Sequence, residues 1–241
     1  MTDLVGHMIE RRRATADRRR FSAPGSDSEG RRQAMKVERA SRAHSAATRV
    51  ALLDAAEQIM LEEGYAAVSS RRLAARAGVN PGLVYYHYDT MDNLFVELFR
   101  RGADRSYQRQ REALEATQPL WALWEAIHDQ SQTALTMEFV SMANHRKTIR
   151  AEIAQSSRRF RLLQLEAVGD ILRGYPDVAP MWTPTTLVML MSSISRFLRM
   201  EESFDIDTGH TETIALIENF LRSVEGERSP GKTRAAGSSR S

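Results

Sequence analysis

The sequence predicts an all-α protein of about nine helices, and three observations support this fold class. Apolar residues recur every three to four positions along most of the chain, which is the spacing of one face of a helix. Valine and isoleucine do not gather in the alternating runs that are typical of strands. Proline, glycine and capping residues fall at intervals that begin and end helices. These patterns place helices over most of the chain between two polar ends.

The expected helices follow one another in order, and most have a recognisable start or stop. The first, 46–63, ends at Gly64, and its apolar face consists of Val50, Leu53, Ala56, Ile59 and Met60. Two short helices follow at 70–77 and 81–87. Longer ones are expected at 91–116, within 119–145 as one helix or two, at 147–173, at 184–201 and at 210–225. Thr90 and Thr183 stand where N-caps belong, and Pro184 takes a first helical position.

Residues 69–88 carry the most specific local pattern in the chain. Gly78 stands where the first helix of the short pair must end and the chain must reverse. Asn80 is a preferred N-cap, and Pro81 follows at the first helical position, where its missing N–H costs nothing. A compact helix-turn-helix with basic residues on the first helix and exposed aromatic residues on the second is typical of proteins that read DNA.

The first helix of this motif supplies three expected DNA contacts. Ser69 and Ser70 lie at its N-terminus, where hydroxyls and free N–H groups suit a phosphate. Arg71 lies in the first turn. Its guanidinium either pairs with a guanine edge, or it contacts a phosphate or is simply a solvated charge.

The second helix is expected to face the DNA with its leading end, which consists of Asn80, Pro81, Gly82 and Leu83. Gly82 allows the backbone to approach closely. Tyr85 and Tyr86 place their hydroxyls either on phosphates or at packing edges. The core under the helix pair is expected to contain Leu73, Val84 and Tyr88.

A contiguous, ungapped series of residues extends this pattern into a family resemblance. The series consists of Glu62-Glu63-Gly64-Tyr65, Arg71, Leu73-Ala74, Ala77-Gly78-Val79, the run 82–88 and Leu94-Phe95. On these residues the segment 46–101 resembles the DNA-binding domain of the TetR family of bacterial transcriptional repressors. The resemblance implies that His87 contacts a phosphate; the alternative is a histidine packed against the next helix.

Two positions depart from the family pattern. Leu83 stands where Ser or Thr is common, and Met91 stands where a phosphate-contacting Lys is common. Leu83 cannot donate a hydrogen bond, although it can touch a thymine methyl group. Met91 removes one electrostatic contact, for which an arginine-rich arm at the N-terminus would compensate.

The resemblance implies that the helices beyond the first four enclose a ligand. Aromatic residues and methionines adapt to irregular apolar ligands, and the same residues at helical spacing also make an ordinary core. The expected lining consists of Trp121, Trp124, His128, Met137, Phe139, Met142, His145, Phe160 and Leu163. The two histidines either orient a polar group of the ligand or serve as packing or surface residues.

The resemblance also implies that the last two helices pair across a homodimer interface. Their apolar positions are Leu187, Leu190, Met191, Ile194, Phe197 and Leu198 in the first and Ile214, Ile217, Phe220, Leu221 and Val224 in the second. The small residues Ser192, Ser193 and Ser195 permit close approach. Two such helices and their symmetry mates can form a four-helix interface.

The two ends of the chain differ in composition from its middle. Residues 1–44 contain arginine clusters at 11–13, 18–20 and 31–32 and a stretch rich in Ser and Gly at 22–30, a composition typical of disorder. This arm is either a flexible tail or a basic segment that neutralises DNA phosphates. The expected organisation is a disordered arm over 1–44, a DNA-binding domain over 45–101, a ligand-binding and dimerisation domain over 102–226, and a disordered tail over 227–241.

Composition excludes several classes of protein. The chain of 241 residues has net charge +3 and no Cys, so it has no disulfide, no Cys-ligated zinc and no thiol nucleophile. No apolar run approaches the roughly 20 residues of a membrane span, and the N-terminus lacks the apolar part of a signal peptide. We therefore expect a cytoplasmic protein without membrane contact.

The chain also lacks the patterns of an enzyme or a metalloprotein. It shows no paired carboxylates, no nucleophile with a base, no Gly-rich phosphate loop and no His-Glu-x-x-His spacing. We expect neither catalysis nor a cofactor. The function predicted from the sequence is a ligand-responsive repressor that a hydrophobic small molecule releases from a palindromic, double-stranded operator. The alternative is a helical scaffold or partner-binding protein that has lost specific operator binding.

Overall fold

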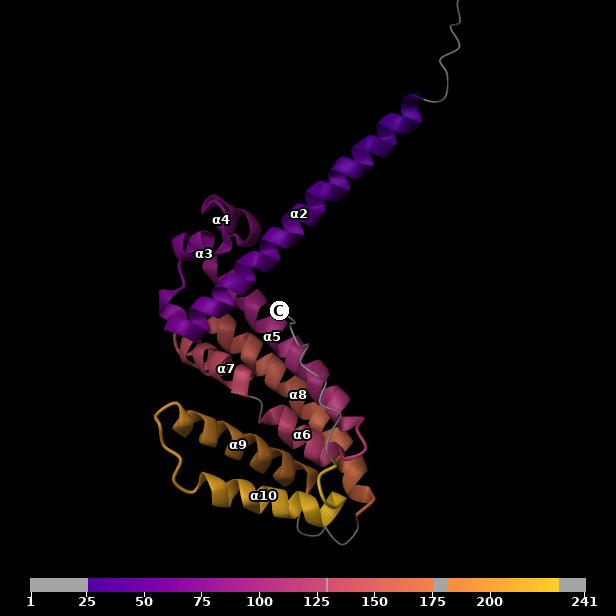
Figure 1. The fold of residues 1–241 in the computed structure, drawn as a ribbon, viewed down its shortest axis with the longest axis vertical. Helices are drawn as coiled ribbons and strands as arrows, with labels where there is room; N and C mark the ends of the chain where they lie inside the picture. The colour runs from indigo at the N-terminus through magenta and orange to yellow at the C-terminus, as the bar shows by residue number, and fades with distance from the viewer. Residues whose placement is uncertain (1–25, 129, 176–181, 230–241) are drawn as a thin grey trace, which may run out of the picture. The chain divides into compact units, whose positions relative to one another are not determined.

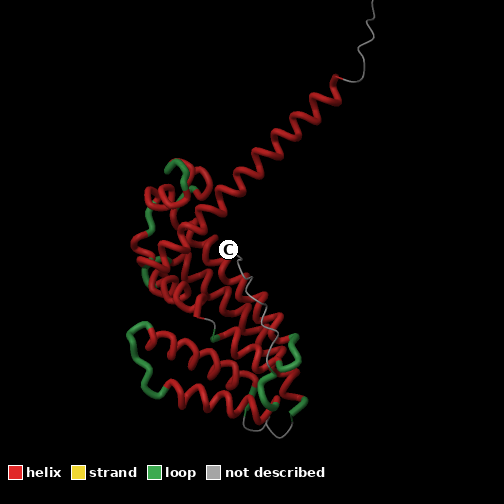
Figure 2. The backbone as a smooth tube through the Cα atoms, in the orientation of Figure 1, coloured by secondary structure: helices red, strands yellow, loops and turns green. Residues whose placement is uncertain are grey.

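The computed structural model describes residues 26–128, 130–175 and 182–229. Within these ranges the chain forms nine α-helices and a three-residue 3-10 helix, with no strand (Figures 1 and 2). The helices are α2 (Ser26–Glu63), α3 (Ser70–Ala77), α4 (Gly82–Tyr88), α5 (Met91–Leu114), α6 (Pro119–Ile127), α7 (Gln130–Ala143), α8 (Lys147–Arg173), α9 (Pro184–Glu202) and α10 (His210–Glu225). The predicted all-α fold class is confirmed.

Helix α2 begins at Ser26, so two predictions for this segment are wrong: a first helix starting at 46 and disorder over 26–44. Side chains from Lys36 to His44 are exposed, which explains the error. The scarcity of apolar residues correctly indicated a lack of core packing. Ala, Arg, Lys, Glu, Met and Gln are nevertheless strong helix formers, and Glu38 pairs with Arg42 one turn later at 2.5 Å. Residues 1–25 of the predicted arm and 230–241 of the predicted tail lie outside the described ranges.

The described residues from Arg49 onward pack as one compact unit with two hydrophobic cores. The first core joins α2, α3, α4 and the start of α5 to α7 and α8, through residues such as Leu52, Leu73, Phe95 and Phe139. At about 100° per residue, Val50 falls opposite Leu52, and its side chain is exposed. The expected placement of Val50 on the inner face is therefore wrong.

The second core joins α6, α8, α9 and α10, through Leu120, Val168, Met191 and Leu221 among others. Helix α5 packs on α6 and α8 and runs without interruption past residue 101. The predicted boundary between 101 and 102 therefore lies inside a continuous helix. The division into a DNA-binding part before residue 102 and a ligand-binding part after it remains a proposal about function.

Most expected starts and stops are present. Helix α8 covers the predicted 147–173, and α10 covers the predicted 210–225. Thr90 and Thr183 cap α5 and α9 by accepting hydrogen bonds from Asn93 N and Thr186 N, at 3.2 and 3.1 Å. The segment 119–145, for which one helix or two was expected, forms α6 and α7.

Candidate DNA-binding surface and ligand pocket

The turn between α3 and α4 has the geometry that its sequence predicts. Gly78 adopts the left-handed conformation, with φ 66° and ψ 32°, at the end of α3. Asn80 Oδ1 accepts a hydrogen bond from Gly82 N at 2.9 Å. Pro81 already has helical dihedrals, φ −53° and ψ −31°. The Asn80 side chain therefore caps the second helix. Helix α4 begins at Gly82, one residue later than predicted.

Two of the three arginines of α3 are held by acidic residues at the end of α2. Arg76 pairs with Glu62 at 2.6 Å, and Arg72 pairs with Glu63. These hydrogen bonds lower the pKa values of both glutamates. Among the described residues, exposed Arg71 has no hydrogen bond or ion pair. Arg71 is thus the α3 arginine that is available to DNA.

The N-terminus of α3 is arranged as expected. Ser69 is its N-cap, and the side chain accepts a 3.4 Å hydrogen bond from Arg72 N. Ser69 is exposed, and Ser70 is half-buried in the first turn.

Helix α4 presents aromatic side chains to solvent. Tyr85 is 51% exposed and Tyr86 is 76% exposed. Val84 and Tyr88 are buried on the opposite face, and Leu73 of α3 is fully buried beneath them. The division between exposed and core positions that the sequence predicted is confirmed, while DNA contact by the tyrosines stays a prediction.

Arg49 holds the end of α4 in place. Its Nη1 donates to His87 O at 3.3 Å, and its guanidinium pairs with Glu97 of α5. Tyr88 Oη donates to Arg49 O at 2.9 Å, and the Arg49 guanidinium lies 5.0 Å from the centre of the Tyr88 ring. The three helices α2, α4 and α5 therefore meet at Arg49. No local pattern in the sequence pointed to this arginine.

The electrostatics of this cluster affect two titratable groups. Burial and the positive charge of Arg49 lower the pKa of His87. Burial raises the pKa of Tyr88 to about 12. His87 is half-buried and its ring lies edge-on to Tyr86, with centroids 5.0 Å apart. Contact between His87 and a phosphate stays a prediction.

The two departures from the family pattern have different surroundings. Met91 is partly buried against the first core, so its side chain contributes packing where a cation would point to solvent. Leu83 is half-buried in the first turn of α4, beside the exposed Pro81 and Gly82. Its contact with a thymine methyl group stays a prediction.

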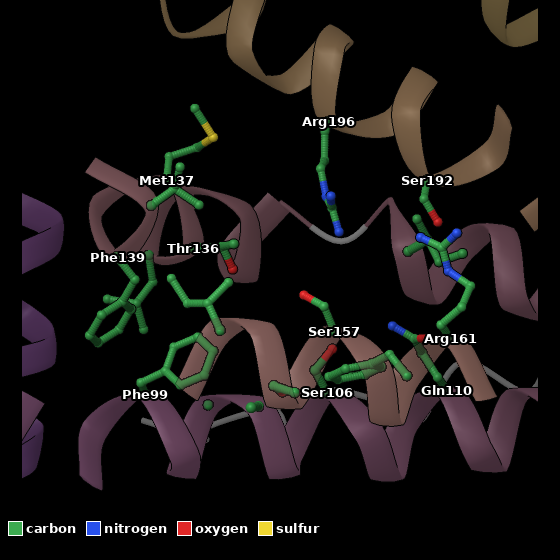
Figure 3. A pocket seen from close by; sticks show the side chains of 18 of the residues that line it. Phe99, Ser106, Gln110, Thr136, Met137, Phe139, Ser157, Arg161, Ser192 and Arg196 are labelled. Carbon is green, nitrogen blue, oxygen red and sulfur yellow. The ribbon is translucent and has the colours of Figure 1, made fainter. Parts of the chain in front are cut away.

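A pocket of about 390 Å³ lies among α5, α6, α7, α8 and α9 (Figure 3). Its apolar wall includes Phe99, Leu135, Met137, Phe139 and Phe160. Three expected lining residues are therefore present: Met137, Phe139 and Phe160. The pocket is also polar in part, because Gln110, Gln164, Arg161 and Arg196 contribute to its lining.

Six expected lining residues lie elsewhere, which corrects the predicted site. Trp121 and Trp124 are buried in the second core, and Met142 is buried in the first. Trp121 Nε1 donates to Gly226 O at 3.2 Å. His145 is exposed in the turn after α7, and Leu163 is half-buried outside the pocket lining.

His128, the sixth of these residues, is a hydrogen-bonded packing residue. It stacks on Trp124 with ring centroids 5.0 Å apart, and its Nδ1 lies 3.2 Å from Ser195 Oγ. Ser195 Oγ donates its own proton to Ile127 O at 3.1 Å. Since a hydroxyl has one proton, His128 Nδ1 must be the donor to Ser195. Burial lowers the pKa of His128, and the charge of Arg199 adds to this effect.

The helical spacing of apolar residues could not separate core positions from pocket positions, because both face inward. The polar pocket residues could have been noticed as polar interruptions on inward faces. Gln164 lies between Phe160 and Val168 on the inner face of α8 and is buried. Its Nε2 donates to Gln110 Oε1 at 2.7 Å.

Two other kinds of feature are absent from the described ranges. No cluster of three or more His, Asp or Glu residues there is arranged to hold a metal ion. No helix there combines the length and apolar character needed to cross a membrane.

Comparisons with known proteins agree with this geometry. Residues 52–98 match the model of the bacterial regulatory proteins of the tetR family. The chain is 23% identical over 201 residues to the transcriptional repressor BepR of Brucella suis. The aligned residues cover 76% of this chain and 96% of BepR. It is 27% identical over 106 residues to the repressor KstR2 of Rhodococcus jostii, covering 44% and 52% of the two chains.

Solved structures show the same fold. The fatty acid degradation regulator FadR of Bacillus halodurans superposes with a TM-score of 0.56 at 18% identity, covering 74% of this chain and 95% of FadR. A transcriptional regulator of Rhodococcus sp. RHA1 gives a TM-score of 0.56 at 20% identity, covering 75% and 99%. The match over residues 52–98 and the exposed helix-turn-helix identify this segment as a DNA-binding domain of the tetR type, and the chain shares the fold of these solved regulators.

Proposed function

We propose that this regulator is a repressor that binds a palindromic operator as a homodimer and is released by a hydrophobic small molecule. The observation that carries this proposal is the path of α5. Leu94, Phe95 and Leu98 lie in the core beneath the helix-turn-helix, and Phe99 and Gly102 line the pocket directly afterwards. One rigid helix thus touches both the DNA-reading unit and the ligand cavity.

A cavity in this position supports control by a ligand. Its volume of about 390 Å³ falls within the range of small-molecule sites, about 300–1,000 Å³. A ligand that binds better to one orientation of α5 shifts the protein towards that orientation, and by linkage it changes DNA affinity. BepR and KstR2 are both named repressors, which favours repression over activation here.

Repression through a palindrome requires two DNA-reading units. One recognition helix contacts too few bases for genomic specificity, and a two-fold dimer presents two. Helices α9 and α10 support such a dimer, because both bury one face in the protomer while Leu190, Phe197 and Leu216 remain exposed.

The test is a gel-shift assay with the DNA upstream of the protein's own gene. Specific binding predicts a retarded band that survives excess random duplex. The same complex is then titrated with dodecanoate and with N-phenyl-1-naphthylamine, which represent aliphatic and aromatic apolar ligands. Release of the DNA by either compound supports the proposal. A protein–DNA complex that neither compound dissociates would contradict control by a hydrophobic ligand.

A further inference from the structure

The pocket has two chemically different ends. In Figure 3, Phe99, Phe139 and Met137 lie together at one end, whereas Arg161, Gln110 and Ser192 lie at the other. Arg196 extends from α9 into the space between them. Such a separation of apolar and polar groups matches a ligand whose own apolar and polar parts are separate.

The polar end carries positive charge without a compensating carboxylate. The described lining includes two arginines, Arg161 and Arg196, and no Asp, Glu or Lys. Arg196 has no hydrogen bond or ion pair among the described residues. Nη1 of Arg161 contacts the sulfur of Met189, and a thioether is a weak acceptor.

The two cations also affect each other. Desolvation by the surrounding side chains lowers the pKa of Arg196, and the charge of Arg161 lowers it further. Arg196 remains exposed overall, so this desolvation concerns the guanidinium end that enters the pocket. Like charges that face one cavity repel each other, and an anion between them removes that repulsion.

Neighbouring polar groups can fix the orientation of such an anion. Ser157 and Ser106 point into the cavity below Arg196 (Figure 3). The buried pair Gln110 and Gln164 shares one hydrogen bond of 2.7 Å, which leaves further donors on both amides.

We propose that the effector of this regulator is an amphipathic anion, whose acid group binds between Arg196 and Arg161 and whose apolar part lies against Phe99, Phe139 and Phe160. This inference rests on the proposed function, since it specifies the ligand of the same pocket. It narrows the ligand from any hydrophobic molecule to one that carries a carboxylate or a similar acid group.

The experiment compares two fluorescent probes that differ in one charged group. 8-Anilinonaphthalene-1-sulfonate is an anion, and N-phenyl-1-naphthylamine has the same aromatic skeleton without the sulfonate. The full chain is titrated with each probe at constant ionic strength. Because hydrogen bonds to charged groups are the stronger class, the sulfonate is expected to bind about tenfold tighter or more. Equal affinities, or no saturable binding of the sulfonate, would overturn the proposal.

Variants locate the charge effect. Arg196→Gln and Arg161→Gln are each expected to weaken sulfonate binding by about tenfold and to leave the neutral probe unchanged. Arg196→Lys, which keeps the charge, retains part of the preference. The matched control is Arg158→Gln, an exposed arginine on α8 outside the pocket lining. An equal loss in R158Q and R196Q shows a non-specific charge effect and contradicts the proposed site.

A third measurement separates this inference from the proposed function. Dodecanoate should displace the sulfonate probe competitively, and methyl dodecanoate should do so at least tenfold more weakly. Both compounds are also added to the protein–DNA complex. Equal displacement and equal DNA release by the two compounds leave the repressor function intact and refute the anion preference. Selective binding of dodecanoate without DNA release supports the anion site and contradicts ligand control.

Discussion

At the residue scale, the arginines of α3 differ in whether their charges are paired. Arg72 and Arg76 are committed to ion pairs with Glu63 and Glu62 at the end of α2, whereas Arg71 is exposed and unpaired among the described residues. All three residues are arginines, and they differ only in the side of α3 from which their side chains project. A contact with DNA is therefore expected of Arg71 in particular.

Replacement of Arg71 tests this expectation. Arg71→Ala should weaken operator binding by about 1–3 kcal/mol if the side chain contacts a base, and Arg72→Ala should have a smaller effect because its charge is already paired. Fluorescence anisotropy with operator and random duplexes provides both affinities. An equal loss on the two duplexes would show that Arg71 positions the protein on phosphates without reading a base.

Two histidines predict how stability depends on pH. The folded state lowers the pKa values of His87 and His128 below the ordinary 6.5, so the unfolded chain takes up protons first as the pH falls. Their contribution to stability is complete above pH 6.5 and declines as the pH drops below that value. Urea unfolding at pH 7.5 and 5.5 should show lower stability at 5.5. His128→Gln should reduce the difference, and an unchanged difference would contradict this role of His128.

At the element scale, helix ends are joined to one another by capping contacts. The carboxylate of Glu225, at the end of α10, accepts hydrogen bonds from Leu120 N and Trp121 N at 2.9 and 3.0 Å. Gln118 Nε2 donates to the carbonyls of Glu225 and Glu227, at 3.1 and 2.8 Å. The first turn of α6 is thereby capped from a distant part of the chain, where a local residue would ordinarily provide the cap.

Removal of this cap has a predictable cost. Glu225→Ala should destabilise the protein by about 0.5–2 kcal/mol, the usual effect of losing an N-cap acceptor. Glu227→Ala is the control, because its carboxylate is largely exposed and pairs with Arg222. Thermal unfolding of both variants is the measurement. Similar melting temperatures for the two variants would show that capping by Glu225 does not stabilise α6.

At the scale of the whole molecule, the outer faces of α9 and α10 carry apolar side chains that the other described residues leave exposed. Phe197 and Leu216 are 53% and 67% exposed, although the same helices bury Met191 and Leu221 within the protomer. Of the apolar positions expected at the dimer interface, Leu187, Met191, Leu198, Ile217, Leu221 and Val224 are used by the protomer core. The proposed interface is therefore narrower than the sequence indicated.

The oligomeric state tests this interface. Phe197→Glu should convert a dimer into a monomer, because a charge buried at the centre of an apolar interface is strongly unfavourable. Light scattering at micromolar concentration measures the mass. Leu162→Glu, on α8 and 71% exposed, is the control and should remain dimeric. A wild-type monomer, or dimers of both variants, would count against the interface.

The basic N-terminal segment is expected to act on DNA through charge. Deletion of residues 1–44 should reduce the slope of log affinity against log salt by about 0.9 for each phosphate that the segment neutralises. Binding isotherms at several salt concentrations with the full and shortened chains provide the slopes. Identical slopes would show that the segment does not compensate for the absence of a cation at Met91.

The sequence by itself determined the fold class, most helix bounds and the helix-turn-helix, because these depend on local signals: caps, Pro and Gly positions and apolar spacing. The left-handed Gly78 and the Asn80 cap are examples that the structure confirmed. Only the tertiary structure decided which inward-facing residues enclose the pocket and which fill the cores. Trp124 and Phe139 have the same periodicity, yet one packs on His128 and the other lines the cavity.

The same division holds for the polar residues. The pairing of Arg76 with Glu62, the capping of α6 by Glu225 and the meeting of Arg161 and Arg196 in one cavity all join residues that are distant in sequence. Such contacts depend on how helices pack against one another. Helical spacing specifies the face on which a residue lies, and packing alone specifies what that face meets.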